Sequence, residues 1–220
     1  MEKIVIFGIG EIAEMAWYYF GQTDSQQIVA FTADREYCLN NDFKGLPLIP
    51  FDEITTHFSP TEYKMFIAVG YTKVNKIRTE KYKLAKTMGY SLTSYISPNA
   101  TIANNVSIGD NCFVFEDNTL QPFTKIGNNC VLWSGNHIGH HSLLEDNCFI
   151  TSHVVVSGGC VIGESTFIGV NATLRDHIKI GKSNVIGAGA LILGDTEDNK
   201  VYMATPTEPS KVPSNRLRGI

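Results

Sequence analysis

The stretch that decides the fold is IGDNCFVFEDNTLQPFTK (residues 108–125), followed at once by IGNNCVLWSGNHIGHHSL (residues 126–143). Each segment has an aliphatic residue at every sixth position, and this period of six runs from Ile96 to Ile192 without a break. A repeat of fixed length indicates a stack of equivalent units, each of which buries its apolar side chains against the next. Residues 91–195 are therefore predicted to form one continuous repetitive domain.

The residue two positions before each aliphatic residue is nearly always small, and Cys112, Cys130 and Cys148 occupy this place in three successive units. The combination matches the hexapeptide pattern of the left-handed parallel β-helix, in which both residues point inward. Three hexapeptides make one triangular coil, so equivalent residues recur every eighteen positions, on coils about 4.8 Å apart. The cysteines then form one interior column, where we expect small buried side chains rather than a disulfide.

Residues 1–90 have a different pattern, in which apolar strands alternate with helical segments. The segment KIVIFGIGEIAEMAWYYF (residues 3–20) predicts a buried strand, a glycine turn and an amphipathic helix. Gly8 and Gly10 in this turn fit the pattern G-x-G-x-x-A, which suits a phosphate at a helix N-terminus, and Asp34 ends the next predicted strand. We predict a small Rossmann-like parallel sheet that binds a nucleotide. The same sequence would also serve a turn that only joins strand to helix.

The composition limits the kinds of partner. Charged residues make up 18% of the 220-residue chain and the net charge is −4, so no basic face for nucleic acid is expected. The first residues lack the features of a signal peptide and no apolar run has the length of a membrane span, so we expect a cytoplasmic protein without membrane contact. The proline-rich residues 196–220 predict an extended C-terminal tail. In this tail Lys211, Arg216 and Arg218 are either solvated or close to cofactor phosphates.

Three of the six histidines, His137, His140 and His141, lie within five positions. The inward positions of this hexapeptide are taken by an aliphatic residue and a serine, so His140 and His141 must lie at a corner of the coil. A zinc site is one interpretation, because His141 and His177 fall two coils apart in one column. The third ligand of such a site would fall on Lys182, which does not supply the neutral imidazole that zinc needs. The sequence therefore favours no metal.

A general base is the interpretation that we prefer for His140. An imidazole can accept a proton from an amine or hydroxyl that attacks a thioester, which contributes about 10²–10⁴-fold in rate. Gly158 follows eighteen residues later, one coil above His140, and its backbone N–H can stabilise the oxyanion that develops on the thioester carbonyl. We predict His140 and Gly158 as a catalytic pair, whereas His137 and His177 are predicted to be solvated.

With these parts in place, the chain resembles the sugar-nucleotide N-acetyltransferases of the hexapeptide-repeat superfamily, such as the bacillosamine- and sialic-acid-pathway acetyltransferases. The resemblance covers nearly the whole chain and lies in the order of FGIGEIAEM, AVGYTKVNKIR, ISPNATIA and GHHS. It implies an acetyltransferase that uses acetyl-CoA to acetylate an amino group, commonly at C4, of a UDP- or dTDP-linked amino-dideoxy sugar. The product is destined for a surface polysaccharide or glycan. The resemblance also implies a homotrimer with acetyl-CoA between adjacent β-helices.

The resemblance assigns roles to residues of the repeat. His140 falls on the catalytic histidine of the family, with His141 directly after it, and Gly158 falls on the glycine at the thioester. Val170 and Ala188 fall near the contacts that the family makes to the pantetheine arm of acetyl-CoA.

The N-terminal domain supplies the other assigned residues. Gly8, Gly10 and Asp34 match the side of the family site that binds the nucleotide sugar. Arg78, in the segment AVGYTKVNKIR, is predicted to contact the same substrate.

Two positions depart from the family pattern. An acid commonly follows the catalytic histidine in the family, and this chain has His141 there. A second family histidine falls on Phe149, whereas this chain has His153 instead. A neutral neighbour gives His140 no charged partner, so the reaction is expected to depend more on positioning of the amine.

Other functions stay open at this point. An O-acetyltransferase that acts on a sugar hydroxyl is the nearest alternative. A metal-dependent hydratase and a non-catalytic trimer that only binds nucleotide sugars are the further ones.

Overall fold

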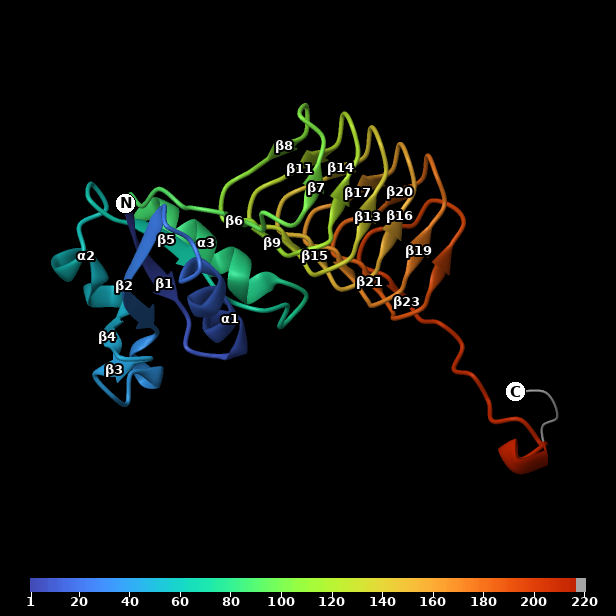
Figure 1. Ribbon diagram of the computed structural model, residues 1–220, viewed down its shortest axis with the longest axis horizontal. Helices are drawn as coiled ribbons and strands as arrows, with labels where there is room; N and C mark the ends of the chain where they lie inside the picture. Colours follow the sequence, from blue (N-terminus) through green and yellow to red (C-terminus); the bar gives the residue numbers. More distant parts are fainter. Residues whose placement is uncertain (217–220) are drawn as a thin grey trace.

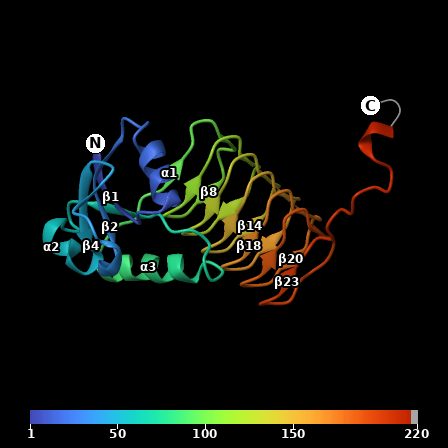
Figure 2. The same cartoon turned by 90° about the horizontal axis from the view of Figure 1, so that it is seen from below.

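The N-terminal part of the protein is a five-stranded sheet covered by helices on both faces (Figure 1, Figure 2). The computed structural model describes residues 1–216. The strand order is β3-β4-β2-β1-β5, and only β3 and β4 pair antiparallel. The strands are β1 (Glu2–Phe7), β2 (Gln26–Ala33), β3 (Asp42–Phe43), β4 (Leu46–Pro50) and β5 (Lys64–Ile67). The helices are α1 (Glu11–Phe20), α2 (Ile54–His57) and α3 (Lys76–Thr87), with short 3-10 turns η1 (Arg35–Tyr37), η2 (Phe51–Glu53) and η3 (Ser214–Arg216).

The central strand β1 explains the layers. Ile4 and Ile6 pack on the α1 side, while Val5 and Phe7 pack on the side of α2 and α3. Because successive side chains alternate across a strand, one apolar run supplies both cores. The antiparallel β3 differs from the parallel sheet that the sequence predicts. It follows from a two-residue hairpin at Lys44–Gly45, whose left-handed φ angles of 53° and 75° match the twist of a tight turn.

The rest of the chain winds into a triangular prism of short parallel strands. Face 1 contains β6 (Tyr95–Ile96), β9 (Phe113–Val114), β12 (Val131–Leu132), β15 (Phe149–Ile150), β18 (Phe167–Ile168), β21 (Val185–Ile186) and β23 (Val201–Tyr202). Face 2 contains β7 (Thr101–Ile102), β10 (Thr119–Leu120), β13 (His137–Ile138), β16 (Val155–Val156), β19 (Thr173–Leu174) and β22 (Leu191–Ile192). Face 3 contains β8 (Ser107–Ile108), β11 (Lys125–Ile126), β14 (Leu143–Leu144), β17 (Val161–Ile162) and β20 (Lys179–Ile180).

Each coil visits faces 1, 2 and 3 in turn, which produces three kinds of corner. We call them the 1–2 corner, the 2–3 corner and the 3–1 corner, after the faces that they join. Within each face, strands pair in parallel with a register of eighteen residues, as in the pairs Leu120 with Ile138 and Ile138 with Val156. The last pair of face 1 differs, because Val185 pairs with Val201. Within the regular coils, a corner residue therefore lies directly above the residue eighteen positions earlier.

The interior of the prism is apolar and closely filled. The aliphatic residues of the repeat form one core cluster that includes the fully buried Ile138, Ile150 and Ile168. Cys112, Cys130 and Cys148 are buried free thiols in one column, in agreement with the expectation of small interior residues. Ile96, at the open first coil, is an exception, because 41% of its side chain is exposed.

The sheet domain packs onto face 1 of the prism. The outward aromatic rings of Phe113 and Phe149 are buried there, against Phe66 at 5.2 Å and Tyr71 at 5.0 Å between ring centroids. On the same side, the buried Asn111 accepts a hydrogen bond from the backbone of Ile67, at 2.7 Å. The two parts thus share one continuous hydrophobic cluster.

The last residues extend the stack further than the sequence indicates. Val201–Tyr202, inside the predicted tail, pairs in parallel with β21 and adds one more strand to face 1. Beyond it the chain leaves the prism (Figure 1), and Lys211 and Arg216 are exposed, while Arg218 lies outside the described residues. No helix within residues 1–216 combines the length and apolar character needed to cross a membrane.

We predict that Ile150→Ala lowers the free energy of unfolding by about 2–5 kcal/mol, because it removes buried carbons and leaves a cavity in the prism. The matched control is Ile96→Ala in the same face, which should cost less than about 1 kcal/mol because its side chain is partly exposed. Urea unfolding at fixed protein concentration measures both. Equal losses would contradict the assignment of the interior column.

Candidate active site

The histidine cluster lies at the 2–3 corner, in the turn between β13 and β14. His140 and His141 are both exposed there, and His141 has a left-handed φ of 58°. The turn is tied to the coil below, because the His140 N–H donates to Oε1 of Gln121 at 2.9 Å and the His141 N–H donates to the Pro122 carbonyl at 3.1 Å. His137 is on face 2 with its side chain partly exposed.

The two imidazoles contact each other through equivalent nitrogens. Nδ1 of His140 lies 3.1 Å from Nδ1 of His141, so one ring donates a hydrogen and the other accepts it. His141 is itself stacked on Phe123, with 4.5 Å between ring centroids. When His140 donates through Nδ1, its Nε2 carries no hydrogen and can accept a proton. His141 can therefore fix the tautomer of His140, as a carboxylate side chain does for many functional histidines.

The structure brings His140 and Gly158 together. A Cβ atom at position 158 would lie 2.6 Å from Cε1 and 2.7 Å from Nε2 of His140, so only glycine leaves room for the ring. The Gly159 N–H donates to the His140 carbonyl at 2.8 Å, which fixes the two coils to each other. Within residues 1–216, the backbone N–H of Gly158 makes no hydrogen bond. The corner thus holds an imidazole beside a backbone amide that makes no hydrogen bond to the described part of the protein.

The other corner histidines are further from this pair. His177 lies one coil above Gly159, where a Cβ would approach its Nδ1 to 2.4 Å. His153 lies at the 1–2 corner, against Gly135, and so it cannot serve as the partner of His140. Lys182, the position of the third zinc ligand, is at the 3–1 corner. In the described part of the chain, no group of three or more His, Cys, Asp or Glu side chains is arranged to hold a metal ion.

Val170 and Ala188 lie at the 1–2 corner, on adjacent coils. The Gly189 N–H donates to the Val170 carbonyl at 2.8 Å, and both predicted residues are exposed. Face 2 separates them from the His140 corner. Its outward side chains include two exposed apolar residues, Val155 and Leu191, with Thr173 between them.

Gly8 and Gly10 line a pocket of about 530 Å³ at the carboxyl ends of β1 and β5. Gly8 has a φ of 122°, and a Cβ there would lie 2.6 Å from the Ala68 carbonyl oxygen, so the turn requires glycine. The opposite wall is the loop Gly70–Thr72. Glu11, the first residue of α1, also lines the pocket. Its negative carboxylate repels a phosphate placed directly on the helix N-terminus.

Asp34 lies beside this pocket and does not line it. It forms an ion pair with Lys81 of α3 in a neighbouring pocket of about 360 Å³. The Lys81 ammonium lies 5.4 Å from the ring centroid of Phe7 and 5.8 Å from that of Phe51. Asp34 therefore offers a ligand a carboxylate that is already paired.

Arg78, the predicted substrate contact, lies in the interior and does not line the Gly8 pocket. Its side chain is completely buried between α3 and the 3–1 corner, and its hydrogen bonds go to neutral oxygens of the protein. Burial lowers the pKa of Arg78 to about 10. The family resemblance assigned Arg78 to the substrate, whereas three of its five acceptors are backbone carbonyls of distant coils, which no sequence pattern indicates.

Sequence reasoning also missed two contacts of the site. Phe123 precedes His141 by eighteen residues, so the same column arithmetic that linked His140 to Gly158 could have found it. The pairing of Asp34 with Lys81 joins a strand end to a helix 47 residues later, and no local signal points to it.

A family model matches part of the chain. The family model described as bacterial transferase hexapeptide (six repeats) matches residues 123–158 and 159–194. A search of curated proteins gives no match.

Two solved structures are similar to nearly the whole chain. The acetyltransferase domain of PglB from Neisseria gonorrhoeae, in complex with acetyl coenzyme A, is 27% identical with a TM-score of 0.79, over 95% of this chain and 99% of that chain. A mutant of perosamine N-acetyltransferase from Caulobacter crescentus, in complex with CoA and GDP-perosamine, is 22% identical with a TM-score of 0.83, over 94% and 96%. At 22% identity, the likeness to the perosamine N-acetyltransferase shows only a shared fold.

These comparisons confirm two predictions. The fold class, a small Rossmann-like sheet followed by a left-handed parallel β-helix, is confirmed. The resemblance to hexapeptide-repeat acetyltransferases is confirmed as well, by the hexapeptide match and the likeness to the acetyltransferase domain of PglB.

The crowding at the 2–3 corner makes a prediction about two glycines one coil apart. Gly158→Ala should leave stability within about 1 kcal/mol of wild type, because the new methyl group meets only the movable ring of His140. Gly139→Ala should cost about 1–3 kcal/mol or more, because a Cβ there lies 2.5 Å from the backbone nitrogen of Gly158. Thermal unfolding distinguishes them, and similar losses would show that the ring of His140 is not free to move.

Proposed function

We propose that the protein is an acetyl-CoA-dependent N-acetyltransferase that acts on the amino group, at C4, of a nucleotide-linked amino-dideoxy sugar. The observation that carries this proposal is the likeness, over 95% of the chain, to an acetyltransferase domain in complex with acetyl coenzyme A. The juxtaposition of His140 with Gly158 supports it independently, since acyl transfer needs a proton acceptor next to an oxyanion donor. The acetylated sugar would serve the synthesis of a surface polysaccharide or glycan.

The chemistry at the 2–3 corner follows from the two residues. The sugar amine attacks the carbonyl carbon of the acetyl thioester, while Nε2 of His140 takes the amine proton. The backbone N–H of Gly158 donates to the oxyanion of the tetrahedral intermediate. Collapse of the intermediate forms the amide and breaks the C–S bond, and the imidazolium of His140 returns the proton to the leaving thiolate. His141 keeps His140 in the required tautomer through the 3.1 Å contact of their Nδ1 atoms.

The positions of the two ligands favour a homotrimer. The pocket of Gly8 and Gly10 belongs to the domain that packs on face 1, whereas His140 lies at the corner opposite that face. A sugar held in this pocket is separated from His140 of the same chain by the width of the prism. We propose that a neighbouring subunit supplies the missing half of each site, with acetyl-CoA between the prisms along Val170 and Ala188. Exposed apolar side chains on face 2, such as Leu191 at 62%, fit a face that meets another subunit.

The cellular location follows from the co-substrate. Acetyl-CoA and nucleotide sugars are metabolites of the cytoplasm, and we place the reaction there. The buried free thiols of the prism fit a reducing compartment.

The experiment that tests the function is CoA thiol release from acetyl-CoA, measured against a panel of UDP-, dTDP- and GDP-linked 4-amino sugars, with the corresponding non-amino sugars as controls. Release with a 4-amino sugar alone supports N-acetylation and identifies the substrate. Release with hydroxyl-only sugars supports O-acetylation instead. Binding of nucleotide sugars without release, and without affinity for CoA, would favour the non-catalytic trimer. No thiol release with any sugar of the panel would reject the proposal.

We predict that His140→Asn and His140→Ala lower kcat by about 10²–10⁴-fold, because the proton acceptor is lost. The dissociation constant for acetyl-CoA should stay close to that of wild type, since the cofactor contacts lie at another corner. Initial rates of thiol release measure kcat, and isothermal titration calorimetry measures the dissociation constant for acetyl-CoA. Unchanged turnover would remove His140 from the mechanism even if the reaction is correct.

Gly158→Ala should lower turnover by about 10²-fold although the protein stays folded, because the methyl group displaces the His140 ring from the site of reaction. Gly194→Ala is the control, since a Cβ at that position meets no atom within 4 Å. The thiol-release assay measures both variants. Full activity of Gly158→Ala would contradict the placement of the thioester beside Gly158.

A further inference from the structure

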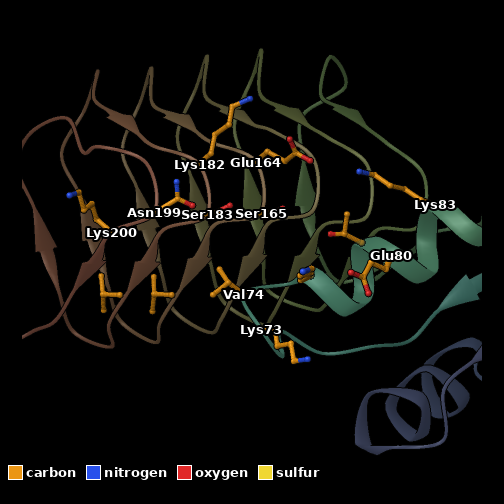
Figure 3. A pocket seen from close by; sticks show the side chains of 14 residues that line it. Lys73, Val74, Glu80, Lys83, Glu164, Ser165, Lys182, Ser183, Asn199 and Lys200 are labelled. Carbon is orange, nitrogen blue, oxygen red and sulfur yellow. The ribbon is translucent and has the colours of Figure 1, made fainter. Parts of the chain in front are cut away.

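A strained turn precedes α3. Lys73, Val74 and Asn75 have left-handed φ angles of 53°, 52° and 64°, three in succession. Residues with a side chain seldom adopt this conformation, and for the β-branched Val74 it is a clear outlier. Such strain persists only where the surroundings fix the backbone, and it concentrates at functional sites. Figure 3 shows Val74 just before α3, on the side of the coils that carry Ser165 and Ser183.

The side chain of Asn75 fixes the turn to the prism. It is completely buried, and its Nδ2 donates to the carbonyl oxygens of Ser165 at 2.9 Å and Thr166 at 3.4 Å. Its Oδ1 accepts from Nη1 of Arg78 at 2.9 Å. Its backbone N–H donates to the Tyr71 carbonyl at 3.0 Å, which closes the turn on the loop before it.

Arg78 ties the same loop to two other coils. Nη1 donates to the Gly70 carbonyl at 3.2 Å, and Nη2 donates to the carbonyls of Asn147 at 2.8 Å and Cys148 at 3.2 Å. Nε donates to the Asn129 carbonyl at 3.3 Å. The acceptors within residues 1–216 are all neutral, so the protein buries a cation whose partners are carbonyl and amide dipoles.

The loop held in this way is one wall of the sugar-nucleotide pocket. Gly70, Tyr71 and Thr72 line the pocket of Gly8 and Gly10. Tyr71 rests on two rings of the prism, with centroids 5.0 Å from Phe149 and 4.7 Å from Phe167, yet its side chain is 54% exposed. The aromatic cluster on face 1 already docks the two domains, so docking alone does not require a strained turn beside the pocket.

We propose that Asn75 and Arg78 are positioning residues that hold the Gly70–Thr72 wall in its ligand-binding form before the nucleotide sugar arrives. They act through the loop and do not touch the ligand. A wall fixed in advance loses little freedom when the ligand binds, which favours affinity. This inference rests on the proposed function, since it assigns the Gly8 pocket to the nucleotide sugar.

The test compares two neighbouring glycine substitutions in the trimer. Asn75→Gly keeps a residue that accepts the left-handed backbone but removes the side-chain clamp. Val74→Gly relieves the same kind of strain and keeps the clamp, and Val74 lines a different groove, of about 690 Å³, on the far side of the turn. The substrate is the nucleotide amino sugar that gives thiol release with wild type.

We expect Asn75→Gly to raise KM for the nucleotide sugar by about tenfold or more, while the dissociation constant for acetyl-CoA stays within about twofold of wild type. Val74→Gly should keep both constants within about twofold. A folded Asn75→Gly with unchanged KM would overturn the proposal, and so would equal losses for both ligands, which indicate general damage. A wild type without turnover would instead reject the proposed function.

Arg78→Lys and hydrogen exchange keep the proposal testable if Asn75→Gly does not fold. Lysine retains the charge, but one ammonium cannot reach carbonyls on both the loop and the coils. We expect the same selective rise in KM. In wild type without ligand, the backbone amide of Asn75, which donates to the Tyr71 carbonyl, should exchange no faster than those of α3, and in Arg78→Lys it should exchange faster until the nucleotide sugar is added. Fast exchange in unliganded wild type would overturn the proposal.

Discussion

The eighteen-residue register of the prism is the constraint on which the rest of the structure depends. It places each corner residue directly above another, so the size of one side chain decides what the next coil can hold. His140 needs glycine above it, and Gly139 has the backbone of Gly158 directly over its Cα. The left-handed turn at His141 belongs to the same regular pattern, since residues at equivalent corner positions share that conformation. A proton acceptor and an open amide thus meet because the repeat brings them to one corner.

The attachment of the sheet domain to face 1 fixes the positions of the pocket and the histidine corner relative to each other. One continuous aromatic cluster joins the domain to the prism, and the buried Arg78 and Asn75 tie it to the 3–1 corner. The pocket at the sheet edge and the histidine corner then face different sides of the same chain. Under the proposed function these are two half-sites held apart, and a neighbouring subunit would bring them together.

The repeat made the prism and its main site predictable, because a period of six fixes the direction of every side chain. His140 and Gly158 could be placed one above the other by counting alone. Contacts between the domains could not be predicted in this way. Arg78 has carbonyl acceptors from residues 51 to 70 positions away, and any amino acid offers a carbonyl, so no sequence pattern indicates its burial. The β3–β4 hairpin was missed because its turn signal, Lys44–Gly45, is short.

The position of the Arg78 acceptors has a consequence for folding during synthesis. The sheet domain and α3 leave the ribosome before any coil of the prism, yet the guanidinium finds its acceptors at residues 129, 147 and 148, and Asn75 finds its acceptors at 165 and 166. Until those coils have been wound, the cation remains hydrated and the two domains cannot lock together. Because the coils leave the ribosome in order, the late coils complete the docking of the earliest part of the chain.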